Sequence, residues 1–310
     1  MAIRGLKEAV RLLSGVLAIG RESLLADLHI EPLEKNSQAT VIRAVDGGSR
    51  VLFDLPGIVI GAYRVSSVEW TPFQLKDIQG DMVVESITKG DQKELLSVMG
   101  YGEDKESWEA AALAVGLRRK MLEWETIYNC VKEVSSGGTV LVDGSLDPVL
   151  APVKEISEMA LEMGKERGVN VVGVSKSSDL SSHGLPYLPL LEWKAITQGV
   201  DSSWISTIRH SKQFSTYIVK FAQHSNHVFR VDVSKDGSTE AVASLCDLCN
   251  DAGYPGYPYP LARAHNISVI DGNTARDLKF ELECMLAGDE SVFWKCLSRN
   301  FHKVLDGGVL

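Results

Sequence analysis

The stretch Ala39–Trp70, ATVIRAVDGGSRVLFDLPGIVIGAYRVSSVEW, contains the pattern from which the fold is inferred. Residues 40–45 are rich in β-prone side chains and end at Asp46-Gly-Gly. Two further β-prone runs follow at residues 51–53 and 58–65. Short apolar runs bounded by Asp, Gly and Pro are typical of strands joined by tight turns. The stretch therefore predicts an antiparallel meander whose first strand ends at Asp46.

Helical and apolar segments alternate in the next part of the chain. Apolar residues recur at helical spacing over residues 105–134 and again over 148–167, and each helical pattern is followed by a short apolar run. These runs lie at residues 139–142 and within GVNVVGVSKSS, residues 168–178. A helix between two such strands favours parallel pairing through a crossover connection. Together with the meander, this order predicts an α/β fold with a mixed central sheet.

The last part of the chain is predicted to add insertions and helices to this sheet. Residues 179–211 read as a loop-rich flap, and residues 214–222 and 227–233 alternate as a hairpin. Residues 239–250 are expected to form one helix. We expect a single domain over residues 1–310, and three regions make it up: an N-terminal helical region at 1–38, the core at 39–272, and a C-terminal helical region at 273–310.

Composition excludes some classes of protein. The chain has 310 residues, of which 45% are hydrophobic and 24% charged, as expected for a folded globular protein. Its net charge of −9 argues against a nucleic-acid coat protein, although a carboxylate-rich nuclease remains compatible with it. No apolar run approaches the roughly 20 residues of a membrane span. The five cysteines include one CxxC, Cys246–Cys249, which we expect to be buried thiols, because a zinc site needs a second pair.

Two aspartates occupy similar positions in the predicted sheet. Asp46 and Asp143 each follow an apolar run and precede a glycine. In α/β sheets, ligand sites lie where strands end, and carboxylate oxygens are preferred by Mg²⁺ and Mn²⁺. Two such metals can hold the attacking water and the leaving oxygen of a phosphodiester. Two ordinary Asp-Gly turns would produce the same pattern, so the residues alone leave both readings open.

Further candidates lie on the long helix and near the C-terminus. LEWE, on the long helix, contains Glu123 and Glu125, either of which could join the aspartates. YPYPLARAH contains Tyr257 and His265 on either side of a proline-rich turn. Imidazole can bind a metal or transfer a proton, and a tyrosine hydroxyl can orient a phosphate or a water.

These motifs, in this order, resemble the NurA nuclease family. The shared features are Asp-Gly-Gly-Ser at Asp46, the helix glutamate, VLVDGSL at Asp143, GVSKSS at Lys176 and YPYPLARAH. The resemblance implies an RNase H-like, Piwi-like fold, in which helices flank a mixed central sheet, with an N-terminal helix and insertions.

The resemblance also implies roles for individual residues. Asp46, Asp143, His265 and one helix glutamate, Glu123 in preference to Glu125, would bind the metal. Tyr257 would be the active-site tyrosine. The DNA would be contacted by two basic residues, Lys176 and Arg263.

The implied activity is that of a metal-dependent deoxyribonuclease. The family uses Mn²⁺, with Mg²⁺ as an alternative, and two ions are expected. It acts as a homodimer with the hexameric HerA helicase-translocase in DNA end resection and double-strand break repair. The resemblance therefore implies a 5′–3′ exonuclease, an endonuclease or both, acting on single- and double-stranded DNA in the cytoplasm.

Two other classes of protein remain as alternatives at this point. An actin-like ATP-binding enzyme also places Asp-Gly turns at strand ends, but it has no role for the Tyr257–His265 stretch. An RNase H-like module without catalysis could serve as an interaction scaffold, although the acidic and histidine positions are all filled. Metal-dependent DNA cleavage would favour the nuclease, and tight ATP binding would favour the actin-like class.

Overall fold

The computed structural model describes most of the chain, namely residues 28–35, 41–55, 57–98, 107–148, 151–182, 185–234 and 239–285. The predicted N-terminal helix and the end of the C-terminal region lie outside these residues. Two compact units make up the chain. The long-hairpin unit comprises Thr40–Val142, Asp147–Val169 and Pro260–Leu310. The antiparallel unit comprises Met1–Ala39, Asp143–Leu146 and Asn170–Tyr259.

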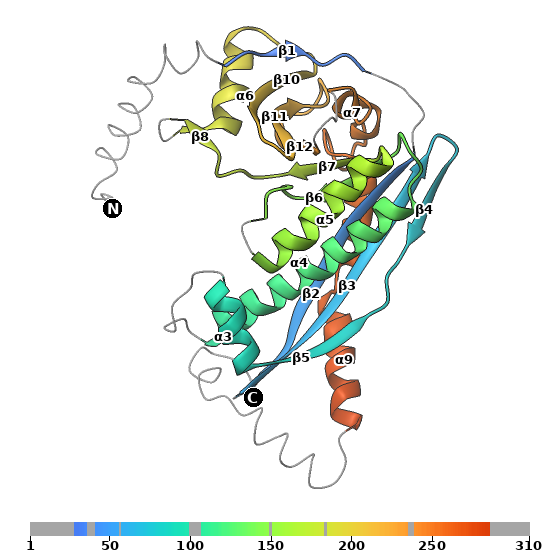
Figure 1. Cartoon of the computed structure of the whole chain (residues 1–310), viewed down its shortest axis with the longest axis vertical. Helices are drawn as coiled ribbons and strands as arrows, with labels where there is room; N and C mark the ends of the chain where they lie inside the picture. Colours follow the sequence, from blue (N-terminus) through green and yellow to red (C-terminus); the bar gives the residue numbers. More distant parts are fainter. Residues whose placement is uncertain are drawn as a thin grey trace, which may run out of the picture. The chain divides into compact units, whose positions relative to one another are not determined.

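The long-hairpin unit is built on two long antiparallel strands, β2 (Ile42–Leu55) and β3 (Ile58–Thr71) (Figure 1). The turn between them contains Gly57, whose φ of 96° favours a residue without a Cβ atom. On its other edge β2 pairs in parallel with β6 (Thr139–Asp143). Strands β4 (Gln74–Ile78) and β5 (Val83–Thr88) each pair with β3 in antiparallel orientation. The prediction of a mixed sheet is confirmed.

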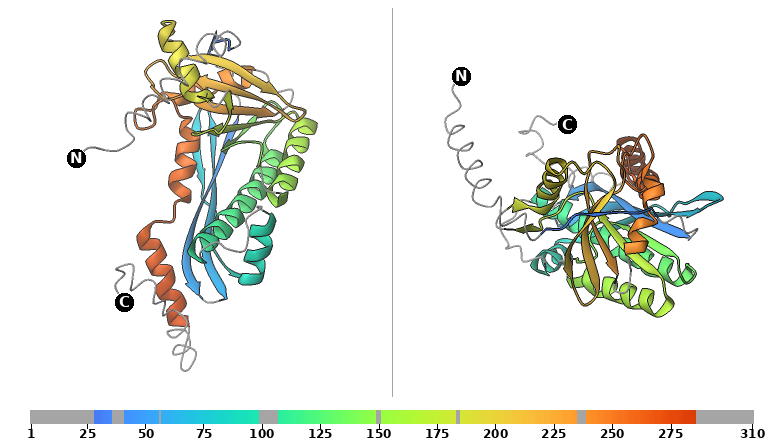
Figure 2. Two further views of the ribbon diagram at one scale, coloured as in Figure 1. Left: turned by 90° about the vertical axis from the view of Figure 1, so that its left-hand side faces the viewer. Right: turned by 90° about the horizontal axis from the view of Figure 1, so that it is seen from above.

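Helices cover both faces of these strands. Helices α4 (Ser107–Glu133) and α5 (Ala151–Arg167) lie on one side of β2 and β3 (Figure 2). Helices α8 (Tyr259–Ser268) and α9 (Gly272–Met285) lie on the other side, as the same views show. A further helix of this unit, α3 (Lys89–Val98), directly follows β5. The flanking helices predicted for an α/β fold are therefore present.

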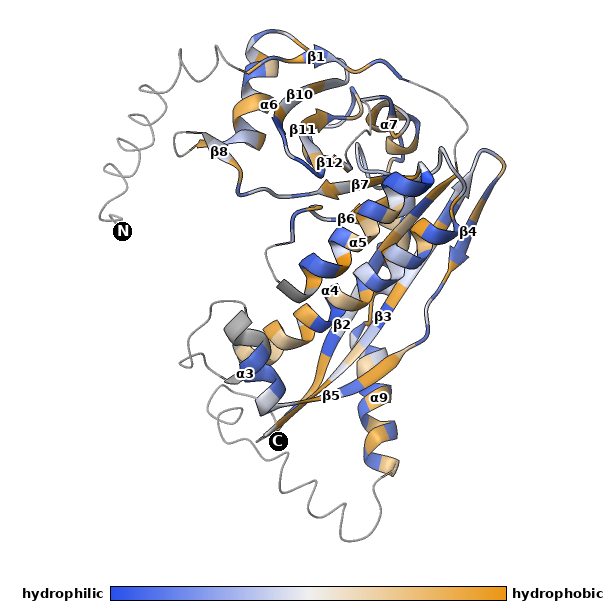
Figure 3. Cartoon of the chain, viewed as in Figure 1, coloured by the Kyte–Doolittle hydropathy of each residue, from blue (hydrophilic) through white to orange (hydrophobic). Residues whose placement is uncertain are grey.

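The period of two residues along β3 divides its side chains between two hydrophobic clusters. Val59 and Tyr63 pack with Ala114 of α4 in one cluster, whereas Ala62 packs with Ala275 of α9 in the other. Both strand faces are therefore buried, which explains why β2 and β3 are apolar on both sides. Helix α9 is hydrophobic only in part, and hydrophilic residues are interspersed along it (Figure 3).

The antiparallel unit contains four strands that pair in the order β10-β11-β12-β7, with β1 (Glu31–Pro32) beside β10. Their bounds are Trp204–His210 for β10, Phe214–Lys220 for β11, Phe229–Ser234 for β12 and Asn170–Ser175 for β7. The hairpin predicted for residues 214–222 and 227–233 is thus β11–β12.

The loop-rich flap predicted for residues 179–211 is wrong. This segment forms a small hairpin, β8 (Ser181–Ser182) and β9 (Leu185–Pro186), then helix α6 (Tyr187–Thr197) and strand β10. Leu190, Leu191 and Ala195 of α6 are buried against Trp204 and Ile218. The helix is stabilised by this tertiary burial, which the prolines and polar residues of the segment obscure in the sequence.

The helix expected over residues 239–250 is interrupted. Helix α7 (Thr239–Ala243) ends before a short 3₁₀ turn at Cys246–Cys249. Cys246 and Cys249 are both buried, and burial raises the pKa of the Cys246 thiol to about 11. The interpretation of the CxxC as buried thiols is in keeping with this environment. None of the helices in the described part of the chain is both long enough and apolar enough to cross a membrane.

Candidate functional site

Asp46 lies inside β2 and does not end it. The pairing of β2 with β3 continues through Asp46↔Ser66, Gly47↔Val65 and Gly48↔Arg64, so the predicted strand end at Asp46-Gly-Gly is wrong. The Asp46 carboxylate is buried, with a residue exposure of 4%. Its Oδ1 accepts a hydrogen bond of 2.8 Å from the Gly47 amide, and its Oδ2 lies 2.8 Å from His265 Nδ1 of α8.

The two glycines after Asp46 allow helices to approach β2 from both faces. A Cβ atom at position 47 would lie 2.7 Å from Glu123 Oε1 of α4. A Cβ atom at position 48 would lie 2.1 Å from the carbonyl oxygen of Ser268 at the end of α8. Successive strand residues face opposite sides of a sheet, so Gly47 faces α4 and Gly48 faces α8. The Asp-Gly-Gly motif therefore reflects close packing of helices on a strand, where the sequence had suggested a turn.

Glu123 is the buried acidic residue of α4, with a residue exposure of 3%. Its carboxylate is paired with Arg119, which also donates to the Gly47 carbonyl at 3.2 Å, and with Lys120 at 2.7 Å. Burial raises the pKa of Glu123, while Lys120 and Arg119 act to lower it and the charge of Asp46 adds to the rise. Glu125, the other candidate on this helix, is more exposed and lies 3.7 Å from Arg118.

Arg119 and Lys120 were not singled out from the sequence. They lie four and three residues before Glu123, and this is the spacing at which helix side chains meet. That spacing was the available signal, but it also describes an ordinary solvated ion pair. Only the burial of Glu123 against β2 distinguishes the two cases.

Asp143 is the last residue of β6. The parallel pairing of β2 and β6 ends at Val45↔Val142, and Asp46 and Asp143 are the residues that directly follow this pair. Asp46 and Asp143 each offer a carboxylate oxygen, and His265 offers an imidazole nitrogen, as a possible ligand atom for a metal ion. The carboxylate oxygens suit Mn²⁺ or Mg²⁺, the metals implied by the resemblance.

Within the antiparallel unit, Asp143 is close to two other predicted site residues. Lys176, directly after β7, places its Nζ 2.7 Å from Asp143 Oδ2. The same ammonium group lies 5.0 Å from the ring centroid of Tyr257. The Tyr257 ring is buried and packs against Phe229 with centroids 5.5 Å apart. This unit thus brings together Asp143, Lys176 and Tyr257.

Arg263 is engaged by a carboxylate. Its guanidinium donates to Asp77 of β4, with Nε 3.1 Å from both carboxylate oxygens. This bond and the charge of Arg263 lower the pKa of Asp77. Arg263 lies on the surface with His265 on the same helix, and its prediction as a DNA contact requires that it exchange Asp77 for a phosphate.

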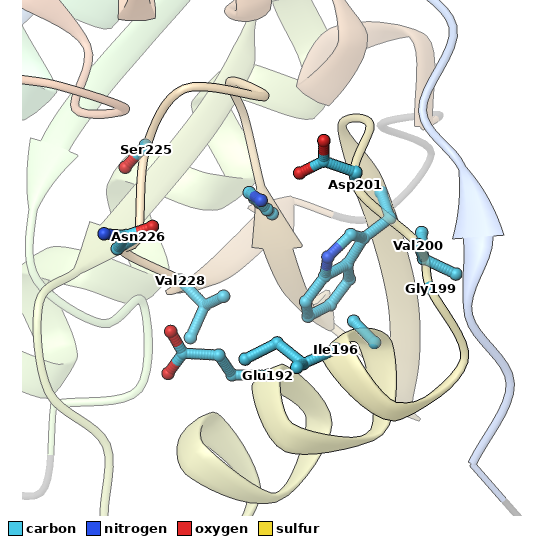
Figure 4. A pocket seen from close by; sticks show the side chains of 11 residues that line it. Glu192, Ile196, Gly199, Val200, Asp201, Ser225, Asn226 and Val228 are labelled. Carbon is cyan, nitrogen blue, oxygen red and sulfur yellow. The ribbon is translucent and has the colours of Figure 1, made fainter.

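The antiparallel unit also contains a cavity of about 250 Å³. Glu192 and Ile196 of α6 line it on one side, and Asn226 and Val228 line it on another (Figure 4). None of the predicted site residues, all of which the structure describes, lines this cavity. The candidate site residues are therefore those that contact Asp46 in one unit and those that contact Asp143 in the other.

Comparison with known proteins agrees with these observations. The sequence model of the NurA domain matches residues 40–270. The NurA nuclease from Sulfolobus solfataricus is similar in structure, with a TM-score of 0.61 and 15% identity over 91% of this chain and 96% of that one. A second NurA structure matches with a TM-score of 0.58 and 11% identity over 94% of this chain and 100% of that one. No curated protein sequence matches the chain.

Proposed function

The chain belongs to the NurA nuclease family, with the RNase H-like fold of that family, and from this premise we propose that it is a metal-dependent deoxyribonuclease. The observation that carries the proposal is the placement of Asp46 and Asp143. Both follow the last residue pair of β2 and β6, and His265 contacts Asp46. Paired carboxylates with an imidazole are suited to the hydrolysis of phosphodiesters.

Asp46, Asp143 and His265 would hold the metal, and Glu123 would join them. Mn²⁺ is the proposed ion, Mg²⁺ is the alternative, and two ions are proposed. When bound, the metal would lower the pKa of a bound water and offset the negative charge of the reacting phosphate. Glu123 would have to leave Arg119 and Lys120 to reach the ion, because both of its oxygens are paired with these cations.

Lys176 and Tyr257 would act on the phosphate. The Lys176 ammonium lies beside both Asp143 and the Tyr257 ring. A phosphate bound next to Asp143 could therefore replace Asp143 as the salt-bridge partner of Lys176. Tyr257 would orient the scissile group through its hydroxyl. Arg263 of α8 would contact the DNA backbone.

The biological setting is proposed from the family. The match over residues 40–270 includes parts of both compact units, which supports the proposal that they act as one nuclease domain. We propose that the protein acts in the cytoplasm as a homodimer with a HerA-type translocase, resecting DNA ends as an exonuclease, an endonuclease or both. Residues 1–20 of the N-terminal region, which would support these assembly contacts, lie outside the described residues.

End-labelled single- and double-stranded DNA, incubated with the protein and Mn²⁺, Mg²⁺ or EDTA, tests the proposal. We expect cleavage to require metal and to fall at least 100-fold in Asp143→Asn, because this variant replaces a negatively charged, metal-binding carboxylate by a neutral amide. Glu155→Gln, an exposed change on α5, is the matched control and should cleave normally. Cleavage in EDTA, or an Asp143→Asn variant as active as the control, would contradict the proposed site.

A further inference from the structure

Asp232 is a fully buried carboxylate of β12, with 0% exposure. It pairs across the sheet with Gly173 of β7 and with Thr216 of β11. Burying a charge is costly unless the charge is paired and hydrogen-bonded. A buried aspartate in the strand FRVDVS therefore needs an explanation in the groups that surround it.

Five hydrogen bonds satisfy this carboxylate. Oδ1 accepts from Thr216 Oγ1 at 2.7 Å and from Arg230 Nε at 3.0 Å. Oδ2 accepts from Arg230 at 2.8 Å, from Ser145 Oγ at 2.9 Å and from the Leu146 amide at 3.1 Å. Arg230 balances the charge, and Thr216 is a neighbour on the sheet. The two bonds to Ser145 and Leu146 instead reach a different part of the chain.

Ser145 and Leu146 belong to the turn that directly follows Asp143. The backbone of this turn is also held to β7, because the Gly144 amide donates to the Val174 carbonyl at 3.0 Å. Gly173 makes room for the turn, since a Cβ atom there would lie 2.4 Å from the Gly144 carbonyl oxygen. The turn after Asp143 is therefore fixed at consecutive residues, and Asp232 supplies the contacts to two of them.

We infer that Asp232 is a positioning residue, which directs the Asp143 carboxylate by holding the backbone of residues 144–146. The inference rests on the proposed function, in which Asp143 binds the metal. Residues that orient a metal ligand from outside the coordination sphere commonly alter metal affinity about 10- to 100-fold when they are changed. A purely structural ion pair with Arg230 would not require the two bonds to the turn.

Asp232→Asn is the test variant. The asparagine side chain has the same shape as aspartate, but one carboxylate oxygen is replaced by an NH₂ group, which cannot accept the hydrogen bonds that the surrounding donors offer. Ser234→Ala is its matched control on the same strand. Ser234 is buried and accepts a hydrogen bond of 3.1 Å from the Val171 amide, so its loss also weakens the sheet without touching the turn. Thermal unfolding of both variants and of the wild type measures how much stability each substitution removes.

Three readouts separate positioning from stability. We expect Asp232→Asn to bind Mn²⁺ about 10- to 100-fold more weakly by calorimetry, to exchange the Leu146 amide hydrogen faster, and to lower kcat with little change in KM for DNA. Ser234→Ala should match the wild type in all three. Should Asp232→Asn fail to fold, Ser145→Ala takes its place. This variant removes one of the two hydrogen bonds between Asp232 and the turn, and it should show the same changes at smaller size.

The outcomes distinguish this inference from the proposed function. A wild-type protein that neither binds Mn²⁺ nor cleaves DNA would overturn both. A wild-type protein that does both, with Asp232→Asn indistinguishable from Ser234→Ala in Mn²⁺ affinity and in Leu146 exchange, would overturn only the positioning role of Asp232.

Discussion

At the scale of single residues, the glycines of the Asp46 motif are the most informative. Gly47 has no positive φ, and its role comes from contact alone, because the Glu123 carboxylate occupies the space that a Cβ atom would need. Gly48 has the same relation to the Ser268 carbonyl. The motif is therefore required by what packs on it from two helices, and a substitution should act through those helices.

Gly47→Ala should displace Glu123 and abolish cleavage while leaving the fold intact. We expect a loss of about 1–3 kcal/mol in the free energy of unfolding, the usual cost of overpacking, and at least a 100-fold loss of activity. Denaturant unfolding and the DNA cleavage assay measure the two effects.

Gly116→Ala on α4 is the matched control for Gly47→Ala. A Cβ atom there meets nothing within 4 Å, so the change should stabilise the helix by about 0.5–1 kcal/mol and leave activity unchanged. If Gly47→Ala cleaved DNA as well as this control, the close approach of Glu123 to β2 would not matter for catalysis.

At the scale of elements, helix α4 has two acidic residues in different environments. Glu123 is buried over Gly47 and held by two cations, whereas Glu125 is partly exposed near Arg118. The sequence motif LEWE left the choice between them open. We propose Glu123 as the glutamate of the site because it is buried beside β2.

Glu123→Gln and Glu125→Gln form a direct test of this choice. The first removes a buried charge next to Asp46, and we expect cleavage to fall at least 100-fold. The second removes a surface charge, for which effects on stability are about 0–1 kcal/mol, and cleavage should stay within about twofold of the wild type. Equal effects of the two variants on the rate of cleavage would contradict the assignment of Glu123.

Other elements show where sequence patterns are reliable. The long helix, the strand before Asp143 and the hairpin β11–β12 were each predicted close to their observed bounds, because their apolar spacing is regular. Helix α6 and the continuity of β2 were missed. Both depend on distant partners: α6 on the cluster around Trp204, and β2 on the helices that face its glycines.

At the scale of the whole molecule, buried thiols link stability to pH. Burial raises the pKa of Cys130 and of Cys246 from 9.0 to about 11. The folded state therefore keeps these protons when the unfolded state loses them. The stabilising contribution is fully present below pH 9 and is lost as the pH rises from 9 to about 11.

Replacing Cys130 should make the stability of the protein less sensitive to alkali. Between pH 8 and pH 10, we expect the wild type to lose about 1 kcal/mol more unfolding free energy than Cys130→Ala, in line with 1.4 kcal/mol per pKa unit. Denaturant titrations at the two pH values measure the difference. Cys284→Ala, at an exposed thiol, is the control and should follow the wild type. The same pH dependence in Cys130→Ala and the wild type would rule out a role for this thiol.

Apart from α6, β10 and the continuity of β2, the sequence by itself determined the main elements, their order and the family. Periods of two and of about 3.6 residues are local properties, and the ordered motifs around Asp46, Asp143, Lys176 and Tyr257 can be read without coordinates. Asp46, Asp143 and His265 were also named from the sequence, whereas Arg119, Lys120 and Asp232 were not.

Only the tertiary structure decided which of these residues meet and which others hold them. His265 contacts Asp46 across 219 positions of the chain, and Asp232 holds the turn after Asp143 from 86 positions away. Such contacts depend on strand pairing and on helix packing, which bring together segments that have no local relation. The role of a buried charge such as Asp232 can be recognised only from its hydrogen-bond partners, because these partners are what make its burial stable.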